Sequence, residues 1–107
     1  MASSRLAKAL FEPQNIALIG ASDDKGRNNS RPQQFLKKHG YKGKIYPINP
    51  RRKKVYGVKA YQSVTEVPDR IDHAFIMTGP KAVPAVMRDC AQAKVKVATI
   101  FTADFAE

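Results

Sequence analysis

The segment from residue 16 to residue 50 constrains the fold of this chain most. It begins with four consecutive apolar residues at 16–19, turns at Gly20 and two further small residues, crosses a helix-like stretch and ends in a second apolar run at 44–48. Short unbroken apolar runs are typical of parallel strands buried on both faces, and Gly20 permits a sharp turn directly after the first run. This order predicts a βαβ unit. Ligands of open α/β sheets bind at the carboxyl ends of the strands, so the same loops are the first candidates for function.

The rest of the chain continues the alternation of strands and helices. Ser30 and Gln33 stand at capping-box spacing and open a crossover helix that Gly40 ends. Phe35, Leu36 and His39 follow at helical spacing. Gly57 and the residues up to 61 are expected as a turn-rich return. The further expected elements are strands over 74–77 and 95–101 and a helix over 81–93.

These elements predict one α/β domain, a Rossmann-like three-layer fold over residues 1–107 with a parallel sheet of about four strands, a truncated sheet being the alternative to a complete one. Residues 1–13 are expected to form a helical arm that Pro13 ends. No apolar stretch resembles a secretory signal or a membrane span, and Cys90 is the one cysteine. We therefore expect a cytoplasmic protein without a disulfide or a membrane partner, with Cys90 in the core.

The charge of the chain points to anionic partners. Nineteen Lys and Arg against nine Asp and Glu give a net charge of +10. The first turn lacks the Gly-x-Gly-x-x-Gly of dinucleotide sites, and the second strand ends in Asn49-Pro50 and the basic run 51–54 instead of an acidic residue. NAD is therefore excluded. A basic residue at this place can pair with the 2′-phosphate of NADP or the 3′-phosphate of CoA, while a merely solvated charge run is the alternative.

Groups able to perform catalysis are few. His39 stands at a helix end and His73 opens a strand, neither with an acid or nucleophile as an obvious partner. The sequence shows no triad, Walker A loop or metal-ligand cluster, so we expect no catalytic residue and no metal site. The candidate binding residues are Gly20, Ser22 and Arg27 after the first strand, Arg51 after the second, and Gly79-Pro80 after the third.

Four motifs spread over most of the chain form a recognisable set. They are Leu10-Phe11-x-Pro13-x-x-Ile16-Ala17, Ile19-Gly20-Ala21-Ser22, Gly43-Lys44-Ile45-Tyr46-Pro47-Ile48-Asn49-Pro50 and Val55-x-Gly57-x-Lys59-Ala60-Tyr61. Together they resemble the amino-terminal CoA-binding domain of ADP-forming (NDP-forming) acyl-CoA synthetases, a family related to the α subunit of succinyl-CoA synthetase. The Gly-Ala-Ser turn and the Tyr-Pro-x-Asn-Pro segment are a fairly specific pair.

The resemblance implies a coenzyme A site on three loops. The residues lining the CoA diphosphate would be Gly20, Ala21, Ser22, Gly26 and Arg27. Those along the adenosine and its 3′-phosphate would be Asn49, Pro50 and Arg51. The pantetheine would lie against Thr78, Gly79 and Pro80, where the family commonly has Val-Pro-Ala.

The resemblance also implies a division of labour within a larger enzyme. Larger members of the family join this domain to a ligase-CoA domain with a phosphorylated histidine and to an ATP-grasp domain, in the same or a partner chain. ATP phosphorylates that histidine, an acyl phosphate forms and CoA attacks it. We therefore expect this domain to hold and aim CoA in an acid-thiol ligase, and not to catalyse the reaction as an isolated chain.

Two alternatives come from other classes of protein. One is a free-standing CoA-binding or NADP-binding regulatory protein, because small proteins carry a similar domain. The other is a nucleic-acid-binding protein that uses the basic run 51–54, although no RRM, KH or helix-turn-helix signature accompanies that run.

Overall fold

The computed structural model describes residues 12–22 and 31–101. The expected arm at 1–13 lies almost wholly outside the described residues. Gly26 and Arg27 lie outside them as well.

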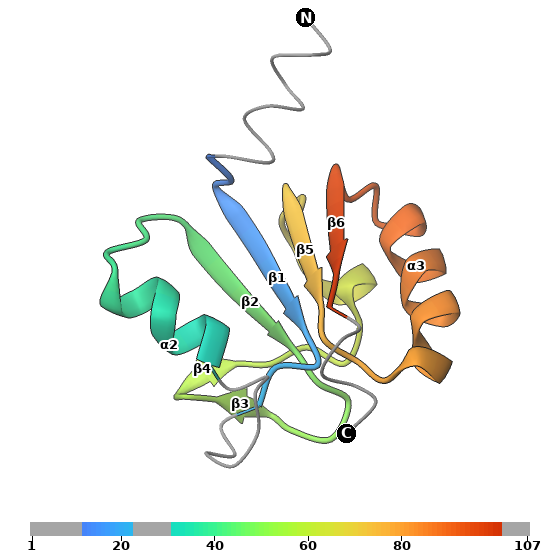
Figure 1. The fold of residues 1–107 in the computed structure, drawn as a ribbon, viewed down its shortest axis with the longest axis horizontal. Coiled ribbons are helices and arrows are strands. Elements are labelled where there is room, and N and C mark those ends of the chain that lie inside the picture. The colour runs from blue at the N-terminus through green and yellow to red at the C-terminus, as the bar shows by residue number, and fades with distance from the viewer. Residues whose placement is uncertain (1–11, 23–30, 102–107) are drawn as a thin grey trace, which may run out of the picture.

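Four parallel strands form one sheet in the order β2-β1-β5-β6 (Figure 1). The strands are β1 (Asn15–Ile19), β2 (Lys44–Ile48), β5 (His73–Ile76) and β6 (Val97–Ile100). Ile19 pairs in register with Ile48 on one side and Ile76 on the other, so the carboxyl ends of these three strands lie level. The chain runs from β1 to one side and later returns to its other side, which makes the junction of β1 and β5 the switch point of the topology. The predicted Rossmann-like fold is confirmed.

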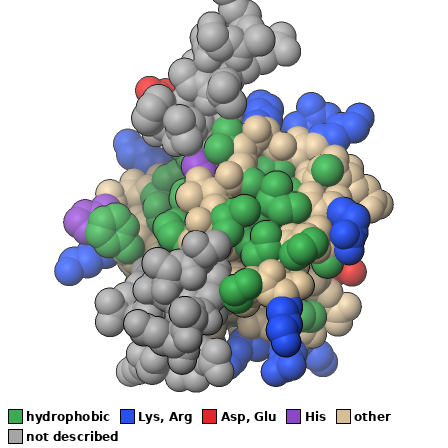
Figure 2. Space-filling view, turned by 45° about the vertical axis from the view of Figure 1, so that its right-hand side comes forward, with side chains coloured by type: hydrophobic (Ala, Val, Ile, Leu, Met, Phe, Trp, Pro, Cys, Tyr) green, Lys and Arg blue, Asp and Glu red, His purple; other side chains and the backbone are tan. Residues whose placement is uncertain are grey.

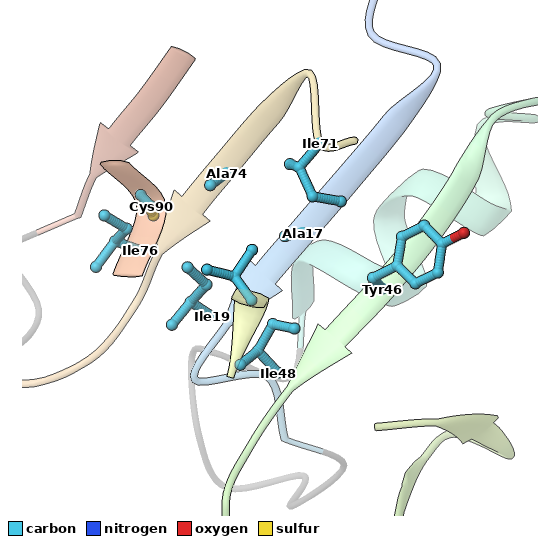
Figure 3. Packing of buried hydrophobic residues seen from close by; sticks show 9 residues of the cluster. Ala17, Ile19, Tyr46, Ile48, Ile71, Ala74, Ile76 and Cys90 are labelled. Atoms are coloured by element: carbon cyan, nitrogen blue, oxygen red, sulfur yellow. The ribbon is translucent and has the colours of Figure 1, made fainter. Parts of the chain in front are cut away.

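One face of the sheet is covered by α3 (Val83–Gln92), which the 3-10 helix η3 (Pro80–Ala82) precedes, and by the 3-10 helix η2 (Val64–Glu66). Alternate residues of β1 point to this face, as the pleat of a strand requires. They belong to a cluster of nine buried residues, which are Ala17, Ile19, Tyr46, Ile48, Val64, Ile71, Ala74, Ile76 and Cys90 (Figure 3). The expectation that Cys90 is a core residue is confirmed, and burial raises the pKa of its thiol to about 11.

The opposite face carries α2 (Arg31–Lys38), which lies across the sheet from α3 (Figure 1). The predicted crossover helix is present, and the side chain of Phe35 on it is 61% exposed. Gln33 and Leu36, three residues apart, turn toward the sheet instead. Phe35 therefore points outward, where its ring packs on that of His39 at 4.2 Å between centroids.

A hairpin stands where the sequence predicted a turn-rich return over 57–61. Its strands are β3 (Lys54–Val55) and β4 (Val58–Lys59). Tyr56 and Gly57 between them have φ values of 50° and 74°, as a type I′ turn requires. The buried Gln33 donates from Nε2 to the carbonyl of Val55 over 3.2 Å, which ties α2 to the hairpin.

Large apolar side chains are exposed where β6 ends. Ile100 and Phe101 are 40% and 42% exposed. Figure 2, in which the right-hand side of Figure 1 comes forward, shows hydrophobic side chains gathered across the middle of the face and basic side chains around its periphery. The ring of Phe75 on β5 stacks on that of Phe101, which follows β6, at 5.8 Å between centroids. Exposed apolar surface beside an edge strand of the described sheet is typical of a site that packs against further protein.

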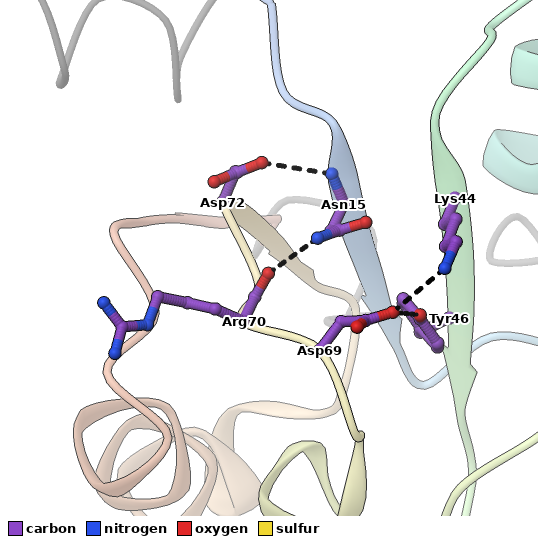
Figure 4. A network of polar contacts seen from close by, with 6 residues as sticks. All are labelled: Asn15, Lys44, Tyr46, Asp69, Arg70 and Asp72. Carbon is purple, nitrogen blue, oxygen red and sulfur yellow. Dashed lines mark hydrogen bonds and ion pairs between the residues drawn. The ribbon is translucent and has the colours of Figure 1, made fainter.

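Polar contacts fix the amino end of the sheet (Figure 4). Asp72 accepts the backbone N–H groups of Gln14 and Asn15 at 2.9 and 3.1 Å and pairs with Lys96 at 3.3 Å. Burial raises the pKa of Asp72, but these partners outweigh it and the pKa lies below its usual value. Asp69 likewise accepts from the hydroxyl of Tyr46. The acids of this end are therefore engaged in holding the strands together.

At the carboxyl end, the loops after β1 and β5 approach each other closely. Gly20 has a φ of 92°, and a Cβ atom there would lie 3.0 Å from the carbonyl oxygen of Met77 and 3.3 Å from Cγ2 of Thr78. The amide of Met77 donates to the carbonyl of Ile19 over 2.8 Å. Any side chain larger than hydrogen at position 20 would force these two loops apart.

We predict that Gly20→Ala lowers the stability of the chain more than Gly40→Ala does. Both glycines have positive φ, so alanine meets backbone strain of roughly 1–2 kcal/mol at each position. Only at position 20 does the new methyl group meet neighbouring atoms, because nothing lies within 4 Å of a Cβ at Gly40. Crowding adds about 1–3 kcal/mol. Urea unfolding of the two variants measures the difference, and equal midpoints would contradict the close approach.

Candidate functional site

Hydrogen bonds join the loops after β1 and β2. The amide of Gly20 donates to the carbonyl of Ile48 over 2.8 Å. Asn49 donates from Nδ2 to the carbonyl of Ala21 over 2.9 Å, and its Oδ1 accepts the amide of Arg51 at the same distance. The side chain of Asn49 therefore holds the two loops together through these hydrogen bonds.

A cavity of about 180 Å³ opens beside these loops on the α3 side of the sheet. Its walls are mostly apolar, with a few polar side chains among them. The lining residues are Ile19, Gly20, Ile48, Pro50, Gln62, Ser63, Val64, Thr78, Ala82, Val86 and Asp89. Pockets for whole drug-sized ligands measure roughly 300–1,000 Å³, so this cavity has room for one part of a larger molecule, such as a ring system.

Thr78, one of the lining residues, carries a hydroxyl without a partner among the described residues. Its Oγ1 is buried and has no hydrogen-bond partner in residues 12–22 and 31–101. A buried hydroxyl without a partner costs about 1–3 kcal/mol, and a polar ligand atom at the site would remove that cost. Cγ2 of Thr78 lies 3.3 Å from the point that a Cβ atom at position 20 would occupy, so Thr78 packs directly against Gly20. This arrangement fits a ligand that crosses the switch point.

The structure brings together Gly20, Pro50 and Thr78, predicted from three different loops, because all three line the cavity. Ala21 and Ser22 are 1% and 5% exposed and lie inside the first turn. The other described candidates stand at the rim or between the loops. Arg51, Gly79 and Pro80 are exposed, and Asn49 is half-buried.

Sequence reasoning missed the part of the cavity that η2 and α3 supply. Ser63 lies just before η2, whereas Val86 and Asp89 lie on the side of α3 that faces the sheet. The α3 segment shows a helical period of apolar residues, which indicates a packed face but no ligand contact. The signal that could have found them is topological, because a helix that follows a strand directly begins at the ligand edge of the sheet.

Among residues 12–22 and 31–101, the two histidines and the acids do not assemble a reactive centre. His73 is buried, stacks on Phe75 and shares a 2.7 Å hydrogen bond with Thr99. Neither it nor the exposed His39 lines the cavity. In the part of the chain that the structure describes, no three His, Cys, Asp or Glu side chains form a group that could hold a metal ion. The same residues include no helix long and apolar enough to cross a membrane.

Comparison with known proteins identifies relatives of this fold and site. A family model described as "CoA binding domain" matches residues 14–107. The acetate–CoA ligase [ADP-forming] II of Archaeoglobus fulgidus is 42% identical over 98 residues, covering 92% of this chain and 15% of the relative. The α subunit of acetate–CoA ligase [ADP-forming] I of Pyrococcus furiosus is 39% identical over 104 residues, covering 94% of this chain and 22% of the relative. The chain thus spans about a fifth or less of these curated relatives.

A solved structure shows the same architecture. The dinucleotide-forming acetyl-coenzyme A synthetase 1 of Ca. Korarchaeum cryptofilum, in its apo form, superposes with a TM-score of 0.86 at 41% identity. The match covers 90% of this chain and 21% of that protein. The resemblance recognised in the sequence is confirmed, and the chain belongs to the CoA binding domain family, in the form found in ADP-forming acyl-CoA ligases.

Proposed function

We propose that this domain binds coenzyme A across the carboxyl edge of its sheet, with the adenine in the cavity. The observation that carries the proposal is the meeting of Gly20, Pro50 and Thr78 at one cavity beside the switch point. The loops after β1 and β5 diverge there to opposite faces of the sheet. An extended ligand can therefore lie between them with one end on each side.

The cavity suits the adenine of CoA in size and lining. Pro50, after β2, and Val86 on α3 both line it, so apolar surface is available to a planar base. Transfer of such a ring from water to apolar surroundings is favourable in proportion to the area buried.

The 3′-phosphate would lie outside the cavity, beside Arg51. Arg51 is exposed and follows Pro50 directly, and its amide is fixed by Asn49. A guanidinium presents paired N–H donors that match phosphate oxygens. The exposed Lys53 and Lys54 add positive charge to the same loop. The 3′-phosphate would thus be the anionic partner of the basic run 51–54. A dinucleotide without such a phosphate offers no group at this place.

The diphosphate and pantetheine complete the proposed path. The diphosphate would follow the turn Gly20 to Ser22, continued by Gly26 and Arg27. The pantetheine would cross the switch point along the loop from Thr78 to Pro80, where the buried Oγ1 of Thr78 can bond a polar ligand atom.

In a complete ligase, the domain would hold the thiol of CoA toward an acyl phosphate. The thiol sulfur attacks the acyl carbon, inorganic phosphate leaves and the thioester forms. The acyl phosphate would come from ligase-CoA and ATP-grasp domains in the same or a partner chain, in the cytoplasm. The exposed apolar surface at β6 supports packing against such a domain, because Ile100 at the end of β6 and Phe101 directly after it are both exposed.

We predict that removing the 3′-phosphate of CoA and removing the Arg51 guanidinium have the same effect on binding. Wild-type protein should bind dephospho-CoA at least tenfold more weakly than CoA, since a hydrogen bond to a charged group contributes about 1.5–3 kcal/mol. Arg51→Ala should bind both ligands equally, at the weaker level. Calorimetric titration at two salt concentrations measures these affinities.

The matched control for this experiment is Arg88→Ala, which removes an exposed arginine that does not line the cavity. It should keep the preference for CoA. The placement of the 3′-phosphate beside Arg51 would be contradicted if Arg88→Ala lost the preference for CoA over dephospho-CoA. It would also be contradicted if Arg51→Ala kept that preference. NADP that competes as strongly as CoA would favour the regulatory alternative, and salt-sensitive oligonucleotide binding unaffected by CoA would favour the nucleic-acid alternative.

We predict that Thr78→Val separates stability from binding. Valine has nearly the shape of threonine but removes a buried hydroxyl that has no partner in the described residues, so the free protein should be as stable as wild type or more stable. CoA affinity should fall about three- to tenfold if that hydroxyl bonds the ligand. Thermal unfolding without ligand and calorimetry with CoA measure the two effects. Unchanged affinity would remove Thr78 from the ligand path.

A further inference from the structure

A carboxylate lines the cavity at a position that the binding of phosphates does not use. Asp89 comes from α3, and its Oδ2 accepts a hydrogen bond from Oγ of Ser63 over 3.4 Å. Ser63 also lines the cavity, and its Oγ accepts the amide of Thr65 at 3.2 Å as the cap of η2. Two elements far apart in the sequence thus place one acceptor and one hydroxyl side by side.

The charge of Asp89 has no basic partner in the described structure. Within residues 12–22 and 31–101 the ion pairs join Lys44 to Asp69 and Lys96 to Asp72, and none involves Asp89. In a chain of net charge +10, an uncompensated acid in the cavity is unfavourable for the phosphates of a ligand and favourable for its hydrogen-bond donors. An ionised carboxylate only accepts hydrogen bonds. A ligand part that contacts Asp89 in the cavity would therefore present a hydrogen-bond donor to it, and on a purine base that donor is an N–H group.

We infer that Asp89 determines the specificity of this cavity for the base, by accepting a hydrogen bond from the exocyclic amino group of a 6-aminopurine. Ser63 is a positioning residue that orients the carboxylate through its hydroxyl. A 6-oxopurine presents an oxygen where adenine presents the amino group, and that oxygen faces the carboxylate unfavourably. The inference rests on the proposed function, which puts the base in this cavity, and adds the group that selects among bases.

The test compares adenosine 3′,5′-bisphosphate with inosine 3′,5′-bisphosphate as competitors of CoA. Both carry the 3′-phosphate and the ribose, and they differ at position 6 of the base and in the adjoining ring proton. Wild-type protein should bind the adenine compound at least tenfold more tightly. Asp89→Asn, whose amide can donate to an oxygen, should reduce that ratio to near one or reverse it. Ser63→Ala should reduce it in part.

The control variant is Glu66→Gln, which neutralises an exposed acid on η2 that does not line the cavity. It should keep the full preference, whereas loss of the preference here would show a general charge effect and overturn the inference. Far-UV circular dichroism and unfolding curves establish that each variant is folded.

The outcomes separate this inference from the function beneath it. Equal binding of the two bisphosphates by wild type, with CoA still preferred over dephospho-CoA, overturns the role of Asp89 and leaves the CoA site in place. If Asp89→Asn keeps the preference for the adenine compound, the role of Asp89 is likewise overturned and the CoA site remains. Absence of CoA binding altogether overturns both.

Discussion

The close approach of the loops after β1 and β5 is the constraint on which the rest of the site depends. At Gly20 only a hydrogen atom fits against the carbonyl of Met77, and the amide of Met77 is bonded to the strand residue just before the glycine. The two loops leave this point toward opposite faces. Three features of the site lie next to Gly20. They are the wall of the cavity, the buried hydroxyl of Thr78 and the hydrogen bond from Asn49 to the carbonyl of Ala21. The backbone geometry at one glycine thus sets the distance between the groups that the ligand would bridge.

The distribution of charge follows the same geometry. The acids at the amino end of the sheet, Asp69 and Asp72, are engaged with strand residues and lysines, and their pKa values are lowered. The basic run that begins at Arg51 stands at the carboxyl end, exposed to solvent. Asp89 is the acid that lines the cavity, next to apolar walls. The edge therefore offers positive charge outside the cavity and a hydrogen-bond acceptor inside it, which matches a ligand with outer phosphates and an amino-substituted base.

Local sequence signals predicted the frame of the structure. The apolar run at 16–19, the turn at Gly20 and the second run at 44–48 are short-range patterns, and each became the element that it predicts. The exposure of Phe35 was not predictable from spacing alone, because Phe35 and Leu36 are adjacent and the helical spacing does not tell which of them faces the sheet. The buried Gln33 fixes the face by bonding the carbonyl of Val55, twenty-two residues away in the chain.

The candidate site could be predicted in part for the same reason. Gly20, Pro50 and Thr78 follow strand ends, so the fold class predicts that they meet. Other features of the site depend on contacts between segments distant in the sequence. Asn49 bonds the loop after β1, and Ser63 and Asp89 meet at the cavity. Such contacts leave no local pattern. Figure 3 shows how residues from separate strands and α3 converge in the core that positions them.

The central claim is that CoA binds at the carboxyl edge beside the junction of β1 and β5. Mapping amide chemical shifts of the isotope-labelled chain during a CoA titration tests it most directly. The account predicts saturable changes at Gly20, Arg51 and Thr78 and their neighbours, with the amides of Lys37 and Lys38 on α2 unchanged. Changes concentrated on α2 or along β6, with none at Gly20 and Thr78, would contradict it.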